Sequence, residues 1–166
     1  MKIDIFLDRQ LLLLYDDSGL QVASYAISSG VKGAGEQKGS FQTPRGKHVV
    51  RAKLGHNLPL NAVLVGRRPT GEIYDAELAQ THPNRDWILT RILWLSGLEP
   101  GVNRLGQVDT MQRYIYIHGT PDGEPMGVPA SHGCIRMRNN DIADLFDRVL
   151  PGTSVNIYEQ SGNLCI

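Results

Sequence analysis

The sequence predicts a mainly β protein with one clear helix. Short runs of β-branched and aromatic residues recur along most of the chain, and one stretch near its end has apolar residues at helical spacing. The 166 residues are about one domain's worth and are enough to bury a hydrophobic core. We therefore expect a single domain over residues 1–166.

The expected strands begin at the N-terminus. Residues 3–8 alternate, with aliphatic side chains at 3, 5 and 7 and acidic or aromatic side chains at 4, 6 and 8, as in a half-buried strand. Residues 10–29 are typical of a strand, a turn at 17–19 and a second strand. Further strands are expected at residues 46–54, 62–67, 87–98, 114–118 and 153–159.

The helix is predicted near the C-terminal end. Asn139 or Asn140 can cap its start, and the Pro151-Gly152 pair ends it. One apolar stripe at helical spacing supports it: Ile142, Leu145, Phe146, Val149 and Leu150.

Two polar connections rich in glycine and proline separate the strands, at residues 33–46 and 67–86. The second is long enough to form a lid or the rim of a site, and a plain surface excursion is an equal alternative. Arg67, Arg68 and His82 are its candidate substrate contacts.

Charge and composition exclude several partners. The 17 basic and 17 acidic residues balance and are interspersed, so neither nucleic acid nor a membrane surface is an expected partner. The longest apolar run near the N-terminus, at residues 11–14, is too short for an export signal or a membrane span. We expect a cytoplasmic protein with free thiols at Cys134 and Cys165. A signal peptide upstream of residue 1 would instead place it in the periplasm.

The chemistry concentrates in residues 114–137. Strand alternation puts Tyr114, Tyr116 and His118 on one face, opposite an isoleucine face, so His118 ends a strand and points away from the apolar layer. The loop 119–133 has four glycines and three prolines, a mixture of sharp turns and restricted backbone. Such a loop can return residues 131–134 to the end of the strand.

Cys134 has the surroundings of a reactive thiol. A nearby imidazole, cationic Arg136 and the following helix N-terminus would favour the thiolate. Gly133 leaves backbone N–H groups open as an oxyanion hole, and a base within reach completes the minimum for acyl transfer.

Other interpretations of these residues stay open. A lone cysteine is often a small buried hydrophobe, although Cys134 has polar or small neighbours. Arg136 is either a structural ion-pair partner or a substrate ligand. The other histidines, His48, His56 and His82, are expected on the surface or in packing. A zinc site from His118, His132, Cys134 and Cys165 has an unusual spacing, so no metal is predicted.

At this point a family pattern is visible. His118-Gly119 is followed by Ser-His-Gly-Cys-Ile-Arg at 131–136, with twelve residues between His118 and Ser131, and an upstream Thr-Pro turn lies at 43–44. This pattern resembles the signature of the L,D-transpeptidase catalytic domain family (YkuD or ErfK). The resemblance implies a flattened β-barrel or sandwich in which the cysteine loop leads into the helix. It implies no cofactor.

The resemblance also implies roles for the residues of the loop. Cys134 is the expected nucleophile, and His118 the proton acceptor and donor, oriented by a backbone carbonyl near Gly119. His132 and Gly133 would shape the site and its oxyanion hole. Three residues are expected to support the loop or bind substrate, for instance through a carboxylate: Arg136, Ser131 and Tyr116.

Family members act on peptidoglycan stem peptides. The thiolate attacks the carbonyl of the third residue, a diamino acid, and expels the terminal D-alanine; an amine or water then takes the acyl group. For a cytoplasmic chain we expect an L,D-carboxypeptidase of peptidoglycan recycling, acting on tetrapeptide or muropeptide fragments. The alternatives are an exported L,D-transpeptidase and a non-catalytic muropeptide- or metal-binding domain. Carbapenems are expected covalent inhibitors through Cys134.

Overall fold

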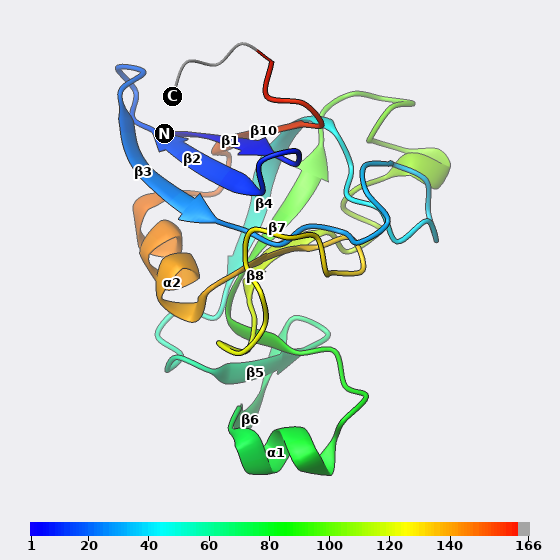
Figure 1. Cartoon of the computed structure of the whole chain (residues 1–166). Helices are drawn as coiled ribbons and strands as arrows, with labels where there is room; N and C mark the ends of the chain where they lie inside the picture. Colours follow the sequence, from blue (N-terminus) through cyan, green and yellow to red (C-terminus); the bar gives the residue numbers. More distant parts are fainter. Residues whose placement is uncertain (163–166) are drawn as a thin grey trace.

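The structure is a computed structural model that describes residues 1–162. Within these residues, ten strands form one sheet in the order β3-β2-β1-β10-β4-β7-β5-β6, with β8 paired to β7 and β9 paired to β8 (Figure 1). The strands are β1 Lys2–Phe6, β2 Leu11–Tyr15, β3 Gln21–Ala26, β4 Gly46–Leu54, β5 Ala62–Val65, β6 Arg68–Ile73, β7 Ile88–Gly97, β8 Tyr116–Gly119, β9 Ile135–Met137 and β10 Ser154–Tyr158. The helices are α1 Ala76–Thr81 and α2 Asn139–Arg148, with a 3-10 turn at Gly106–Val108.

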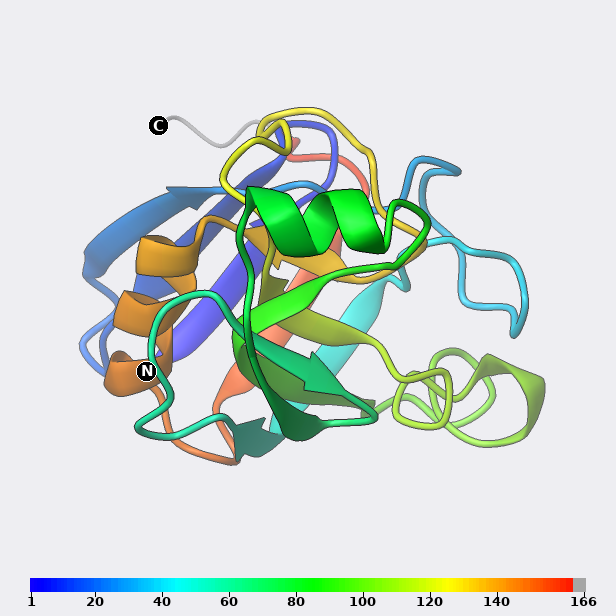
Figure 2. The same ribbon diagram turned by 90° about the horizontal axis from the view of Figure 1, so that it is seen from below.

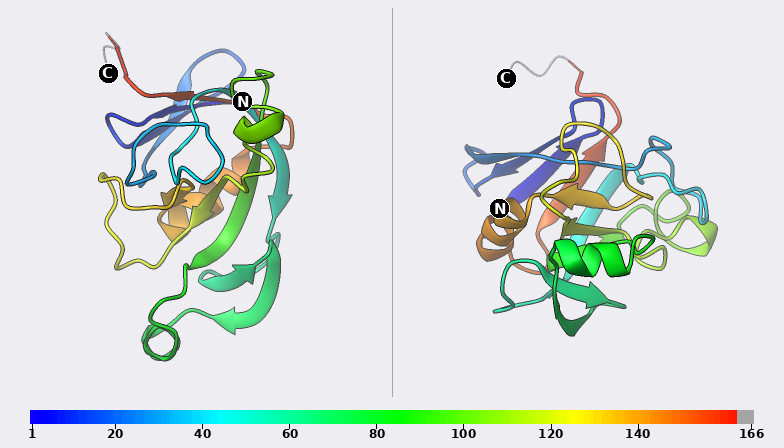
Figure 3. Two further views of the ribbon diagram at one scale, coloured as in Figure 1. Left: turned by 90° about the vertical axis from the view of Figure 1, so that its right-hand side faces the viewer. Right: turned by 60° about the horizontal axis from the view of Figure 1, so that its bottom comes forward.

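The sheet curls into a half-barrel around α2 (Figure 3). This confirms the predicted mainly β fold class with a helix that follows the cysteine loop. Most strand pairs are antiparallel, and β1–β10 and β8–β9 are parallel. The strand predicted at residues 46–54 has the same bounds in β4, and most of the other predicted strands agree within a few residues.

Strand β7 is the branch point of the sheet. Its C-terminal part pairs with β4, and its first residues pair with β5. On the opposite edge it pairs with β8, in a register that sets Ile92 against His118 and Trp94 against Tyr116. Pairing with this ten-residue strand therefore positions β8, and with it His118, in the middle of the molecule.

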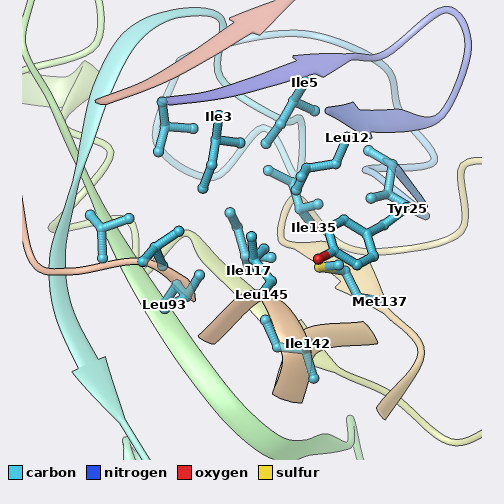
Figure 4. Packing of buried hydrophobic residues seen from close by; sticks show 14 of the residues in the cluster. Ile3, Ile5, Leu12, Tyr25, Leu93, Ile117, Ile135, Met137, Ile142 and Leu145 are labelled. Carbon is cyan, nitrogen blue, oxygen red and sulfur yellow. The ribbon is translucent and has the colours of Figure 1, made fainter. Parts of the chain in front are cut away.

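The hydrophobic core lies between the curled sheet and α2 (Figure 4). The predicted isoleucine face of β8 points into it, since Ile115 and Ile117 are buried. Each fully buried aliphatic side chain contributes roughly 1.5–3 kcal/mol relative to exposure. Core residues from both layers include Ile3, Ile5, Leu12, Leu93, Ile117, Ile135, Met137, Ile142 and Leu145.

The ends of α2 differ from the prediction. The N-cap is Arg138, with no side-chain capping bond, and Asn139 is turned inward and buried. The helix ends at Arg148, so Leu150 lies beyond it with 73% of its surface exposed. The predicted asparagine cap and the last residue of the stripe are therefore wrong, because tertiary hydrogen bonds take up Asn139.

Strand β1 is buried on both faces, which the alternation did not predict. Phe6 stacks on Tyr158 of β10 at 5.3 Å between ring centroids, and Asp4 pairs with Lys2 and accepts a hydrogen bond from Asn156. The polar face is covered because β1 lies between β2 and β10 inside the sheet.

The connection 67–86 contains two elements that the sequence did not reveal. The β5–β6 hairpin turns at Gly66 and Arg67, both with positive φ, and Asp75 caps the short helix α1 through the Leu78 N–H at 2.8 Å. Seen from below, α1 lies beside the β5–β6 hairpin at the end of the molecule that faces the viewer (Figure 2). It has no buried residue and so leaves no apolar stripe in the sequence. Neither helix described in residues 1–162 is long and apolar enough to cross a membrane.

Candidate active site

A cavity of about 290 Å³ lies at the end of β8, beside the returning cysteine loop. Its lining also includes Phe41, Asp86 and Tyr114, which come from three other segments of the chain. The cavity brings together six of the residues singled out from the sequence: Tyr116, His118, Ser131, His132, Cys134 and Arg136.

The loop returns because β9 pairs in parallel with β8. Ile117 lies opposite Ile135 and His118 opposite Arg136, so the isoleucines enter the core while the polar pair stays on the cavity side. Residues 28–30 hold the other side of the loop, through single bridges to Arg136 and Ser131. Figure 3 (left) shows the cysteine loop and the 27–46 segment on the same side of β7.

Thr43 explains the upstream Thr-Pro turn. Its hydroxyl donates to the carbonyl of Gly133 at 2.9 Å and accepts from the N–H of Gly30 at 2.9 Å. Gly133 has a φ of +123°, and a Cβ there would lie 3.0 Å from the carbonyl oxygen of Gln42. Residue 133 must therefore be glycine for the turn before Cys134 to form against this segment.

Cys134 lies in the cavity with its thiol between two backbone groups. The Tyr116 N–H donates to Sγ at 3.3 Å, and the thiol donates to the carbonyl of Tyr114 at 3.4 Å. Behind it, the hydroxyl of Ser131 donates to the Cys134 carbonyl and accepts from the Gly133 N–H at 3.1 Å. Ser131 is buried and supports the loop, and the Gly133 N–H already has a partner.

His118 is fixed by its neighbour. Its Nδ1 lies 2.6 Å from the carbonyl oxygen of Gly119, and a carbonyl can only accept, so Nδ1 carries the proton. In the neutral ring Nε2 is then the acceptor. Burial lowers the pKa of His118, against the Gly119 hydrogen bond and Asp86, which raise it. His118 is therefore neutral at pH 7 and able to accept a proton.

The thiol of Cys134 is also neutral in the free site. Burial by the surrounding protein raises its pKa to about 11, although part of the side chain faces the cavity. The Tyr116 N–H and the positive charges of Arg136 and Arg113 oppose this rise without cancelling it. The prediction of a favoured thiolate is therefore wrong here, because it counted charges and not desolvation. Moreover, α2 starts beyond the far end of β9.

The two reactive groups line the same cavity without a hydrogen bond between them. Among the described residues, the hydrogen bonds of the Cys134 thiol go to the Tyr114 and Tyr116 backbone and none goes to His118. Catalytic hydrogen bonds of this kind often tighten only when substrate binds.

Gly119 and Asn139 form the support behind His118. A Cβ on Gly119 would lie 2.5 Å from both the Leu89 carbonyl oxygen and Oδ1 of Asn139, so only glycine fits. The Asn139 side chain donates to the Thr120 carbonyl at 2.8 Å and accepts from the Thr90 hydroxyl at 2.6 Å. This buried amide therefore ties the end of β8 to β7, a role that no pattern in the sequence indicated.

Arg136 is held by acids. Its guanidinium forms ion pairs with Asp86 at 3.2 Å and Glu124 at 3.9 Å, and 11% of its side chain is exposed. The structure thus favours the ion-pair interpretation of Arg136. His132 lies at the mouth of the cavity, well exposed, 4.0 Å from Asp86 and edge-on to Phe41.

Arg113 is a site residue that the sequence analysis missed. It donates to the Gln42 carbonyl at 2.7 Å and to the Gly35 carbonyl at 3.3 Å, and so holds the 33–46 connection beside Cys134. Burial lowers its pKa. Its partners come from a distant part of the chain, so no local pattern could indicate them.

The remaining histidines lie outside the cavity. His48 is buried and bonded to the Gly46 carbonyl at 3.0 Å and the Thr110 hydroxyl at 2.9 Å, whereas His56 and His82 are exposed. Residues 1–162 contain no group of three or more histidine, cysteine or acidic side chains placed to hold a metal ion. Cys165, a member of the alternative zinc set, lies outside the described residues.

Of the three candidate substrate contacts in the 67–86 connection, one lies near the cavity. Arg67 donates to the hydroxyl of Tyr116 at 3.1 Å. Arg68 and His82 are exposed, and neither lines the cavity.

A cysteine and a neutral histidine lie in one cavity on a curled, mainly β sheet, and they are the two side chains that acyl transfer by a cysteine requires. The family model for the L,D-transpeptidase catalytic domain (YkuD) matches residues 1–157. The chain therefore belongs to the L,D-transpeptidase catalytic domain family.

Relatives and solved structures agree with this. A probable L,D-transpeptidase ErfK/SrfK of Escherichia coli K12 is 50% identical over 48 residues, which are 29% of this chain and 16% of that protein. L,D-transpeptidase 3 of Mycobacterium tuberculosis, in complex with a faropenem-derived adduct, has 16% identity and a TM-score of 0.57 over 95% of this chain and 59% of that one. The L,D-transpeptidase LdtMt1 in complex with imipenem has 17% identity and a TM-score of 0.54 over 94% and 57%. This chain thus spans under two thirds of each of these proteins.

Proposed function

We propose that this protein is a cysteine acyl-transfer enzyme that removes the terminal D-alanine from peptidoglycan tetrapeptides. The observation that carries the proposal is the shared cavity of Cys134 and His118, in which Gly119 fixes the imidazole with Nε2 free to accept. Family membership supplies the substrate class, and the cavity supplies the chemistry.

Because both groups start neutral, the first step is general-base catalysis. Nε2 of His118 takes the thiol proton as Sγ of Cys134 attacks the carbonyl of the third residue. The carbonyl oxygen becomes negative and needs donors. The Tyr116 N–H lies close by, with its nitrogen 3.3 Å from Sγ, and we assign it as the hydrogen-bond donor to this carbonyl oxygen.

The second step releases the amine. The imidazolium of His118 donates its proton to the nitrogen of D-alanine, the carbon–nitrogen bond breaks, and a thioester on Cys134 remains. A water molecule, deprotonated by His118, then attacks the thioester. The carbon–sulfur bond breaks, the imidazolium returns its proton to Sγ of Cys134, and the products are a tripeptide acid and the free thiol. His118 thus acts twice as base and twice as acid, which its single fixed tautomer permits.

The second nucleophile decides the name of the reaction. We assign water, and with it a carboxypeptidase that acts on dilute soluble fragments in the cytoplasm. The second candidate is transpeptidation to an amine, favoured by the family to which the chain belongs. Location remains a prediction, to be tested by fractionation of cells that express the full gene product.

The deciding experiment incubates the protein with free tetrapeptide and follows the products by mass spectrometry. Loss of one D-alanine, absent in Cys134→Ala, would support the carboxypeptidase. Crosslinked dimers, or exchange of D-alanine for an added D-amino acid, would show the transpeptidase instead. A protein that binds the peptide and leaves it unchanged would be the non-catalytic alternative.

Carbapenems provide an independent probe of Cys134. We propose that they acylate its thiol, since the similar protein LdtMt1 is seen in complex with imipenem. Intact-protein mass spectrometry should show one imipenem adduct on the wild type and none on Cys134→Ala. An adduct on the Ala variant would place the reaction elsewhere.

A further inference from the structure

Three arginines lie at or near the Cys134 cavity, and they differ in what already neutralises them. Arg136 is paired with Asp86 and Glu124. Arg113 is half-buried and its N–H groups are bonded to carbonyl and hydroxyl oxygens of the 33–46 connection. Among residues 1–162, no carboxylate forms an ion pair with Arg67, so its positive charge remains uncompensated by the protein.

Arg67 is held in place without an acid. Its guanidinium lies 4.5 Å from the ring centre of Trp94 and 5.1 Å from that of Tyr114, in two cation–π contacts. Its Nη1 donates to the Tyr116 hydroxyl at 3.1 Å. The residue stands at the tight β5–β6 turn with a φ of +65°, and its side chain lies against Trp94 of β7 and Tyr116 of β8. A long side chain is thereby ordered before any ligand arrives.

Two of the three aromatic residues that hold Arg67 also line the cavity. Tyr114 and Tyr116 both line it, and the Tyr116 N–H touches the sulfur of Cys134. The guanidinium has five N–H donors, and one of them is used. The planar fork of the remaining donors matches the two oxygens of a carboxylate.

We propose that Arg67, together with the Tyr116 hydroxyl, is a binding site for a carboxylate of the substrate. The inference rests on the proposed function and deepens it, because it moves carboxylate recognition from Arg136, which is occupied, to Arg67. A tetrapeptide offers this carboxylate from two sources. One is its C-terminus, and the other is the side chain of the diamino acid, which diaminopimelate carries and lysine lacks.

The test uses Arg67→Gln and three tetrapeptides. These are the free acid with diaminopimelate, the same peptide with a C-terminal amide, and the lysine-containing free acid. For the first peptide we expect Arg67→Gln to raise KM roughly tenfold with little change in kcat, the usual effect of losing one charged hydrogen-bond donor. The effect should vanish with whichever peptide lacks the recognised carboxylate, which identifies the source.

Arg68→Gln is the matched control. It removes the same charge from the next residue, which is exposed on β6, so its KM should equal that of the wild type. An equal rise in both variants would show long-range attraction in place of a site, and would overturn the inference. Tyr116→Phe tests whether the role of Arg67 is purely structural. If Arg67 only oriented Tyr116, Arg67→Gln and Tyr116→Phe would lose activity equally on all three peptides.

The two hypotheses fail in different ways. If the wild type cleaves tetrapeptide and Arg67→Gln has the same KM, the carboxylate site is wrong and the proposed function stands. If the wild type cleaves nothing, the proposed function is wrong, and calorimetry on Cys134→Ala with and without Arg67→Gln then tests the site by peptide affinity alone. Equal affinities, or no binding, would overturn it there as well.

Discussion

The imidazole Nδ1 of His118 lies 2.6 Å from the carbonyl oxygen of Gly119, the next residue in the chain. The imidazole is thus oriented by the neighbouring backbone, and within residues 1–162 no acidic side chain is hydrogen-bonded to it. The position of that carbonyl depends on the packing of Gly119 against Leu89 and Asn139.

Gly119→Ala tests this dependence. The added Cβ would lie 2.5 Å from the Leu89 carbonyl oxygen, so the strand end must shift and turn the carbonyl away from His118. We expect activity to fall by about a hundredfold or more, and stability to fall by about 1–3 kcal/mol from overpacking. Steady-state kinetics and urea unfolding measure the two effects. Gly123→Ala is the control, since nothing lies within 4 Å of a Cβ there, and unchanged activity in both variants would contradict the argument.

Thr43 tests the support of the cysteine loop. Thr43→Val keeps the shape but leaves the Gly30 N–H and the Gly133 carbonyl without their partner. Unpaired buried polar groups cost about 1–3 kcal/mol each, so the melting temperature and the activity should both fall. Thr43→Ser keeps the hydroxyl and should restore most of the activity. A valine variant as active as the wild type would show that the loop is held by other contacts.

The reactivity of Cys134 should depend on pH as a raised thiol pKa requires. With a pKa of about 11 the thiolate is scarce at pH 7, and its rate of alkylation by iodoacetamide should climb steadily up to pH 10. Asp86→Asn removes a nearby negative charge that raises this pKa, so its profile should move to lower pH. Stopped-time mass spectrometry of the Cys134 peptide gives both curves. A plateau near neutral pH in the wild type would mean a preformed thiolate.

Acid stability should be governed in part by His48. Burial lowers its pKa from 6.5 to about 4, so the unfolded chain binds the proton more readily than the folded one. Above pH 6.5 His48 is neutral in both states, and the free energy of unfolding is at its full value. As the pH falls toward 4, proton binding by the unfolded chain lowers the free energy of unfolding by up to about 3 kcal/mol. The free energy of unfolding, measured with urea between pH 4 and 7, should change less steeply with pH in His48→Gln than in the wild type. His82→Gln, which changes an exposed histidine, should show the same pH dependence of the free energy of unfolding as the wild type.

The sequence predicted the strands and the reactive loop well, because both depend on local pattern. Alternation placed His118 and Tyr116 on one face of β8, and the spacing of glycines and prolines indicated that the loop returns to it. The helix α1 escaped because it buries no residue and so has no periodic signal.

The other contacts of the site could not be predicted from the sequence, because they join residues that are far apart in the chain. Asn139 binds Asn61, 78 positions away, and Arg113 binds Gln42, 71 positions away, so neither pairing is visible locally. The pKa of Cys134 follows from how much protein surrounds the sulfur, which the list of neighbouring charges does not reveal.

The position of β10 has a consequence for how the molecule is made. Among residues 1–162, β10 lies between β1 and β4, so in the strand order the N-terminal meander β3-β2-β1 reaches the other strands through it. On a ribosome, residues 154–158 must emerge before β1 and β4 can be joined in one sheet. Such distant pairings also form late and slowly in folding. The protein therefore acquires its complete sheet only after residues 154–158 have been synthesised.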